Sequence, residues 1–172
     1  MAKNKIIIAL GIPILILLSL TVTPLLALNF GQTILLETIP VDPIDLFRGQ
    51  HVILNYKISE IVEPPNASEI EEAFNNKKWL PVYGVLENKG QYYELKDLTL
   101  QKPKGIFLKG KLQYVYTNEN GKRVFRVDYN LDKYFVPEGT GQSLEDASRN
   151  GSLVAQIKVY NGYGQLMNIR AQ

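Results

Sequence analysis

The chain has 172 residues, a formal net charge of +2 and 45% hydrophobic residues, which is enough for one ordinary core plus an appended segment. It has no cysteine and a single histidine. A disulfide framework, a thiol nucleophile and a thiolate metal site are therefore excluded, and a zinc site would have to consist almost wholly of carboxylates. We predict no metal and no cofactor.

The first predicted element is an uncharged apolar run at 6–27, dominated by Ile and Leu. As an α-helix it would be about 33 Å long, which is enough to cross the hydrocarbon core of a bilayer. Lys3 and Lys5 precede the run, and the first acidic residue is Glu37. Because positive flanking charge stays on the cytoplasmic side, the pattern predicts a cytoplasmic N-terminus and a domain outside the membrane.

A cleaved signal peptide is the alternative interpretation of this run. Ala27 could be the last residue removed, but Leu25 fits the small-residue cleavage pattern badly. We therefore predict an uncleaved membrane anchor at 1–30 and one extracytoplasmic domain at 31–172. Beyond the anchor, 17 basic residues balance 17 acidic ones, so the charge gives no reason to expect nucleic-acid binding.

The domain is predicted to consist mostly of short strands, because apolar and polar residues alternate between clusters of turn-forming residues. The expected strands are 32–39, 52–58, 80–86, 91–100, 104–116, 122–131, 153–160 and 164–169. Two short helices are expected at 67–75 and 143–149, and turn sequences at 118–121 and 161–162 predict two hairpins. This order predicts a mainly antiparallel β-rich domain, barrel-like or sandwich-like, with two short helices.

The hairpin around 118–121 is expected to bury one side of each strand. These sides contain Ile106, Leu108, Leu112, Tyr114 and Tyr116 on one strand and Phe125, Val127, Tyr129 and Leu131 on the other. The same hairpin is basic, with Lys102, Lys104, Lys109, Lys111, Lys122, Arg123 and Arg126. We prefer a solvated strand face to contact with anionic lipid headgroups or a partner, since exposed lysines also protect strand edges from pairing.

The segment 41–58 combines a capped turn with a strand. Asp42 can cap a short helical turn, and Pro43 suits its first position. Gly49 can adopt the left-handed conformation that ends the turn. From residue 52 onward, apolar and polar residues alternate, which predicts a half-buried strand.

This segment resembles the signature of the GDYXXLXY family of membrane-anchored bacterial proteins. The matching residues are Asp42, Pro43, Asp45, Arg48, Gly49, Leu54 and Tyr56, while Gln50 and His51 stand where the family has Asp and Tyr. A second similar segment consists of Tyr134, Phe135, Val136, Pro137, Glu138 and Gly139. The resemblance implies a bacterial cytoplasmic (inner) membrane location and no particular reaction. We predict that the motif residues have structural or interaction roles.

Three features could be mistaken for chemistry. His51 has no evident nucleophile to activate, so a solvent-facing strand residue is the better interpretation. Asp45 and Arg48 lie three residues apart and are expected to have a structural use, either pairing with each other or bracing the loop before Tyr134, rather than to bind a substrate. The segment 139–141 reads Gly-Thr-Gly but lacks the further glycine and the lysine of a phosphate loop. We predict no catalytic residue.

Three functions remain open. We favour a non-enzymatic accessory or interaction protein, and the resemblance implies that its partner is a multi-pass membrane protein. The second hypothesis is a membrane-anchored hydrolase resembling signal peptidase, with Ser59 as nucleophile and Lys57 as base. The third is a binding module whose aromatic-lined β pocket holds a lipid or another small apolar ligand.

Overall fold

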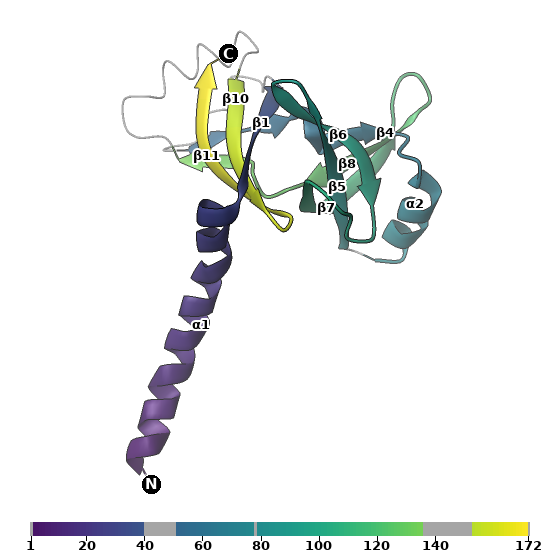
Figure 1. Ribbon diagram of the computed structural model, residues 1–172. Coiled ribbons are helices and arrows are strands. Elements are labelled where there is room, and N and C mark those ends of the chain that lie inside the picture. The colour runs from purple at the N-terminus through teal and green to yellow at the C-terminus, as the bar shows by residue number, and fades with distance from the viewer. Residues whose placement is uncertain (1, 40–50, 78, 136–152, 172) are drawn as a thin grey trace.

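A computed structural model describes residues 2–39, 51–77, 79–135 and 153–171 (Figure 1). A long helix, α1 (Ala2–Phe30), leads into a β-rich body. The first half of the body contains β1 (Gln32–Ile39), β2 (His51–Ile53), β3 (Asn55–Tyr56), the 3-10 turn η1 (Lys57–Ser59), β4 (Glu60–Val62) and α2 (Ala67–Asn75). The second half contains β5 (Leu80–Lys89), β6 (Tyr92–Thr99), β7 (Phe107–Thr117), β8 (Arg123–Asp128), β9 (Lys133–Phe135), β10 (Leu153–Tyr160) and β11 (Tyr163–Ala171).

The strands form three antiparallel sheets. Their orders are β11-β10-β1-β3, β2-β9 and β4-β8-β7-β5-β6. Together the sheets form a half-barrel and a nearly closed barrel. The predicted mainly β, antiparallel fold is therefore confirmed. Helix α1 precedes the first strand, and α2 lies between β4 and β5 in the chain. The predicted helix at 143–149 lies outside the described residues.

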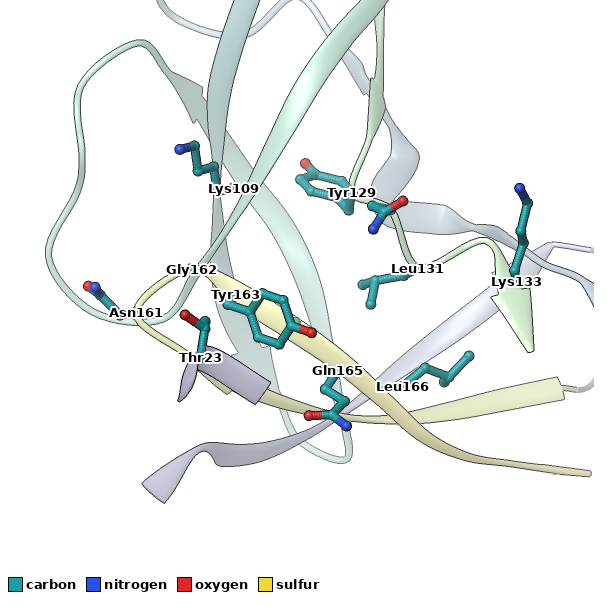
Figure 2. A pocket seen from close by; sticks show the side chains of 12 residues that line it. Thr23, Lys109, Tyr129, Leu131, Lys133, Asn161, Gly162, Tyr163, Gln165 and Leu166 are labelled. Carbon is teal, nitrogen blue, oxygen red and sulfur yellow. The ribbon is translucent and has the colours of Figure 1, made fainter. Parts of the chain in front are cut away.

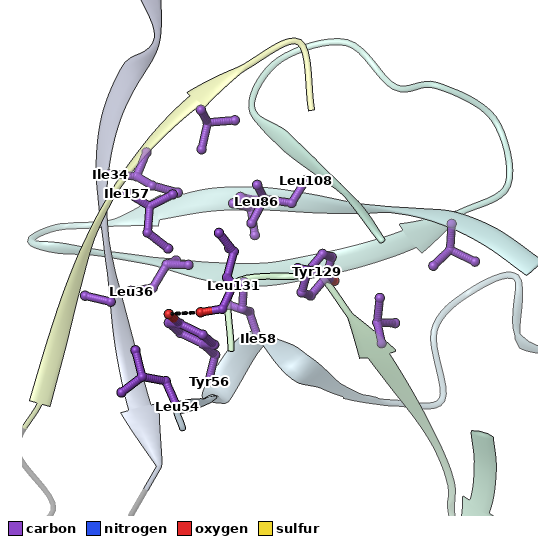
Figure 3. Close-up of a cluster of buried hydrophobic side chains, with 14 of the residues drawn as sticks. Ile34, Leu36, Leu54, Tyr56, Ile58, Leu86, Leu108, Tyr129, Leu131 and Ile157 are labelled. Carbon is purple, nitrogen blue, oxygen red and sulfur yellow. Dashed lines mark hydrogen bonds between the residues drawn. The ribbon is translucent and has the colours of Figure 1, made fainter. Parts of the chain in front are cut away.

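One continuous core fills the space between the two larger sheets (Figure 3). From the first sheet, β1 contributes Ile34 and Leu36, and β10 contributes Ile157. From the second sheet, Leu108 and Phe125 are almost fully buried. The predicted alternation of apolar residues is confirmed for these strands, since each places one side on this core and the other toward solvent.

The segment 52–58 is not the continuous strand that its alternation predicts. It divides into β2, β3 and the 3-10 turn η1. The physical reason is that β2 pairs with β9, whereas β3 pairs with β1, so the chain passes from one sheet to another within a few residues. The inward positions nevertheless hold, because Leu54, Tyr56 and Ile58 are all buried.

The prediction that Tyr114 and Tyr116 face the core is wrong. Their side chains are 47% and 39% exposed, whereas Leu112 on the same strand is buried. The pairing of β7 with β8 shifts register between Leu112 and Tyr114. An extra residue in one strand turns the following side chains to the other face, and the tyrosines consequently point outward.

The apolar N-terminal helix is confirmed and is longer than predicted. Its part from Leu10 to Phe30 has a mean hydropathy of 2.2 and is long and apolar enough to cross a membrane. Side chains along it are exposed, Leu15 to 70% for example. The helix projects from the β body as a single rod (Figure 1).

The end of α1 is fixed to the β body by several contacts. Ala27 is fully buried, and the bond from the Gly31 backbone N–H to the Ala27 carbonyl, 2.9 Å long, closes the last turn of the helix itself. The Lys158 ammonium of β10 donates to the Leu28 carbonyl, one of the carbonyls that a helix end leaves without an intrahelical partner. Along the chain, only Gly31 separates the end of α1 from the start of β1.

Candidate functional site

The two segments that carry the family resemblance lie side by side. His51 of β2 is paired with Phe135 of β9, and Val52 with Tyr134. The Leu54 backbone N–H then donates to the Asp132 carbonyl over 2.8 Å. The other signature residues, Asp42, Pro43, Asp45, Arg48, Gly49, Val136, Pro137, Glu138 and Gly139, lie outside the described residues, as do Gln50 and the segment 139–141. For His51, Tyr134 and Phe135 only the backbone is described.

Leu54 and Tyr56, the Leu and Tyr of the family signature, are core residues, each 3% exposed. The Tyr56 hydroxyl donates to the Leu131 carbonyl over 2.8 Å (Figure 3). Leu131 lies in the connection between β8 and β9. This bond therefore joins the motif strand to the segment that leads into the second family block. Of the two roles predicted for the motif, the structural one fits these two residues.

The hydroxyls of Tyr56 and Tyr129 resist ionisation. Burial, and secondly the negative charge of Asp132, raises the pKa of Tyr56 well above its usual value of 10, and burial raises the pKa of Tyr129. A raised folded-state pKa means that the stability these groups contribute is complete below pH 10 and is lost as the pH rises above it.

We expect the urea unfolding midpoint of the full chain in detergent to fall steeply between pH 9.5 and 11.5. Each buried tyrosine contributes a slope of up to about 1.4 kcal/mol per pH unit. A Tyr129→Phe variant lacks one of these groups, so its unfolding midpoint should decline less steeply with pH. Both proteins contain the same lysines, so the titration of lysine cancels when the two curves are compared. Identical slopes for the two proteins would contradict the argument.

A network around Arg126 lies beside the motif strand. The Arg126 Nη1 donates to Glu60 Oε1 and its Nη2 donates to Asn55 Oδ1, both over 2.8 Å. The Tyr116 hydroxyl donates to Glu60 Oε2 over 3.3 Å. The network ties β3, β4, β7 and β8 together and accounts for one of the predicted basic residues. Two others are ion-paired as well, Lys122 with Glu63 and Arg123 with Glu71.

An exposed apolar and aromatic surface adjoins this network. We call it the tyrosine face, and it consists of Val62, Tyr114 and Tyr116. Val62 and Tyr116 are both paired with Val124 of β8, and the rings of Tyr114 and Tyr116 are 6.0 Å apart. Val62 is 48% exposed. Exposed tyrosines next to an arginine are typical of protein–protein interfaces.

A cavity of about 480 Å³ lies where the β body meets α1 (Figure 2). We call it the helix-side pocket. Its lining comes from α1, β7, the β8–β9 connection and the β10–β11 turn with the start of β11. The residues include Thr23, Lys109, Tyr129, Asn130, Leu131 and Lys133. The turn is held in place because the Lys109 backbone N–H donates to the Gly162 carbonyl over 2.8 Å. Lys109, which the sequence predicted to lie on a solvated strand face of the basic hairpin, is one of the lining residues.

The Ser59 and Lys57 side chains point to different environments. Ser59 is buried, whereas Lys57 is exposed and forms an ion pair with Glu37 over 2.9 Å. Within the part of the chain that the structure describes, no group of three or more His, Asp or Glu side chains could hold a metal ion.

The architecture defines a class of protein: a body of antiparallel sheets on one helix that is long and apolar enough to span a membrane. A family model described as GDYXXLXY protein matches residues 13–169, so the chain belongs to the GDYXXLXY family. No curated protein and no solved structure matches the chain.

The helix-side pocket was missed in the sequence. Thr23, Lys133 and Gln165 are far apart along the chain, and none of them belongs to a motif. The surface formed by the exposed tyrosines was also missed. Tyr114 and Tyr116 follow Leu112 at every second position, so the sequence predicted that all three side chains face the core. A local signal exists only for the turn, where Asn161 and Gly162 both have positive φ, at 52° and 84°, as a two-residue hairpin turn requires.

Proposed function

We propose that this protein is a single-pass, membrane-anchored accessory protein whose extracytoplasmic β body binds a multi-pass membrane protein. In a bacterial cell the membrane would be the cytoplasmic (inner) membrane, with the N-terminus inside. The observation that carries the proposal is the attachment of α1. An exposed apolar helix whose end is fixed to a β body holds that body at a set height beside the bilayer.

The tyrosine face is the surface that we assign to the partner. Its tyrosines and Val62 offer apolar contact area, and Tyr116 already has its hydroxyl oriented by Glu60. Aromatic side chains lose few rotatable bonds when they become buried, and they are enriched in binding hot spots. The adjoining Arg126 network keeps the strands beneath this surface together.

Anchoring and orientation can be tested with sealed membrane vesicles that contain the full chain. We expect the chain to stay in the membrane fraction after a wash with high salt and urea. Protease added on the extracytoplasmic side should degrade the β body, and protease on the cytoplasmic side should leave it intact. Release of the chain by the wash, or digestion of the body only from the cytoplasmic side, would refute the proposed topology.

Partner binding can be tested by placing a photo-crosslinking amino acid at position 116 of the full chain in cells. We expect a specific adduct with one multi-pass membrane protein, and much less of it with the crosslinker at Lys89, which is exposed at the end of β5. In the crosslinking strain, Tyr114→Ser should reduce the adduct at least tenfold, because interface aromatics commonly contribute 2 kcal/mol or more, roughly thirtyfold in affinity. An equal yield at both positions would count against the tyrosine face.

A further inference from the structure

On the proposed topology, the helix-side pocket would lie at the level where the anchor leaves the bilayer. Thr23 is seven residues before Phe30, so it lies about 10 Å below the end of α1. The β10–β11 turn comes back toward this part of the helix (Figure 1). An anchor needs about 20 residues to cross the hydrocarbon core. Counted from the start of the uncharged run at residue 6, this places Thr23 and the pocket beside it close to the outer headgroups.

The pocket has a positive charge that the protein does not neutralise. Lys109 and Lys133 lie on opposite sides of it, with Tyr163 between them (Figure 2). None of the described residues that line the pocket is acidic. Neither lysine has an ion-pair partner among the residues the structure describes, whereas Lys57, Lys89, Lys96 and Lys122 all have one. Asp132, the residue before Lys133, lines a neighbouring cavity, and Asp128 lines another cavity together with Lys109 but forms no ion pair with it.

Two further features suit an occupant from the headgroup layer. The Gln165 side chain lines the pocket, and its Oε1 is buried with no hydrogen-bond partner within the described part of the chain. A buried acceptor without a donor is costly, so a ligand with a hydroxyl group would satisfy it. Tyr163 is partly exposed at the same site, and tyrosine is enriched at membrane interfaces.

A second aromatic–lysine pair extends this surface along β7. Lys111, two residues from Lys109 and so on the same strand face, lies 5.3 Å from the ring of Trp79. Trp79 is 69% exposed. Within the described residues Lys111 also forms no ion pair, although Asp128 is its cross-strand neighbour on β8. Exposed tryptophan next to lysine is the composition of surfaces that rest on anionic bilayers.

We propose that the helix-side pocket binds the headgroup of an anionic phospholipid of the phosphatidylglycerol type, taken from the leaflet that surrounds α1. Lys109 and Lys133 attract the phosphate, a headgroup hydroxyl donates to Gln165 Oε1, and the acyl chains continue along the apolar surface of α1. The proposal rests on the proposed function in one respect, since it requires α1 to be in the membrane. It gives the lipid a role in fixing the β body against the bilayer.

Native mass spectrometry of the full chain in mild detergent tests this proposal. The chain is titrated with phosphatidylglycerol and with phosphatidylcholine of the same acyl length. We expect one phosphatidylglycerol molecule to bind preferentially. In a Lys109→Gln/Lys133→Gln variant its affinity should fall about thirtyfold, because each lysine near an anionic group contributes roughly fivefold, while phosphatidylcholine binding should stay the same.

The matched control is Lys89→Gln/Lys122→Gln. It removes the same charge from the end of β5 and from the β7–β8 turn, and neither lysine lines the helix-side pocket. Its phosphatidylglycerol affinity should stay within twofold of the parent. An equal loss in both double variants would show a general charge effect and overturn the site. Equal binding of the two lipids by the parent would overturn it as well.

Two further arms identify the ligand. Gln165→Met should weaken phosphatidylglycerol binding severalfold but leave phosphatidic acid, which has no headgroup hydroxyl, unaffected. Soluble glycerol phosphate should compete poorly, and full competition at equal concentration would mean a soluble ligand instead of a lipid. These readouts differ from the topology test: a chain that stays in the membrane but shows no lipid preference refutes the lipid site alone, whereas release from the membrane refutes the anchor.

Discussion

A Gly84→Ala substitution should lower the free energy of unfolding by about 2–3 kcal/mol, the usual cost of adding atoms to a close-packed core. Gly84 lies in β5, where the ring of Tyr129 crosses its backbone. A Cβ atom at this position would overlap the Tyr129 Oη and would lie 2.9 Å from Leu95 Cδ1. Real Cβ atoms essentially never approach other atoms this closely, so β5 or Tyr129 would have to shift. Urea unfolding of the full chain in detergent micelles measures the loss.

The same site offers a rescue that tests the cause. The Tyr129 Oη is buried without a hydrogen-bond partner among the described residues, so Tyr129→Phe alone should be neutral or stabilise by about 1 kcal/mol. In the double variant the worst overlap disappears, while the 2.9 Å approach to Tyr129 Cζ remains. We expect about half of the loss to be recovered, a coupling of roughly 1 kcal/mol or more. Strictly additive effects would mean that Gly84 is required for another reason.

The second large effect is expected at Tyr56, the Tyr of the family signature. Tyr56→Ala should cost about 3–5 kcal/mol, as for other large aromatic residues removed from a core. Tyr56→Phe keeps most of the packing but leaves the Leu131 carbonyl without its 2.8 Å hydrogen bond. That variant should cost about 1–2 kcal/mol. Thermal and urea unfolding of the full chain separate the packing contribution from the hydrogen-bond contribution.

Tyr114→Phe is the matched control for this series. It makes the same chemical change on an exposed side chain of β7, where surface substitutions usually stay within about 0.5 kcal/mol. If Tyr56→Phe were as harmless as Tyr114→Phe, the hydrogen bond to Leu131 would not hold the motif strand in place. The structural role of the signature tyrosine would then rest on packing alone.

The predictions for Tyr56 concern a position of the family signature that lies in the core, and they distinguish it from the two surfaces that we assign to binding. Leu54 and Tyr56 build the core and join the two family segments through the β8–β9 connection. Their place in the signature is therefore accounted for by a structural role in the core. The surfaces that we assign to a partner and to a lipid, the tyrosine face and the helix-side pocket, contain neither residue. A search for the function of the protein should thus begin with Tyr116, Lys109 and Lys133 instead of the signature itself.

The sequence by itself determined the elements whose signals are local. The uncharged run at 6–27 predicted α1, because the length and composition of one continuous segment are enough to recognise a helix that could span a bilayer. Alternation predicted β1, β10 and β11, and Asn161-Gly162 predicted the turn between the last two strands. Helix α2 was also placed correctly. Its N-cap, Asn66, forms no side-chain capping bond, and α2 is held instead by the burial of Ile70.

Only the tertiary structure decided the features that depend on pairing between distant segments. The division of 52–58 follows from β2 and β3 joining different sheets, and the outward turn of Tyr114 and Tyr116 follows from a register shift against β8. The helix-side pocket brings Thr23, Lys109, Lys133 and Gln165 together from α1, β7, β9 and β11. Hydrophobic periodicity and the residue preferences of turns act over a few residues. The register between strands, and the point where the chain passes from one sheet to another, are set by packing across the whole β body. That difference is why the core could be predicted from the sequence and both candidate binding surfaces could not.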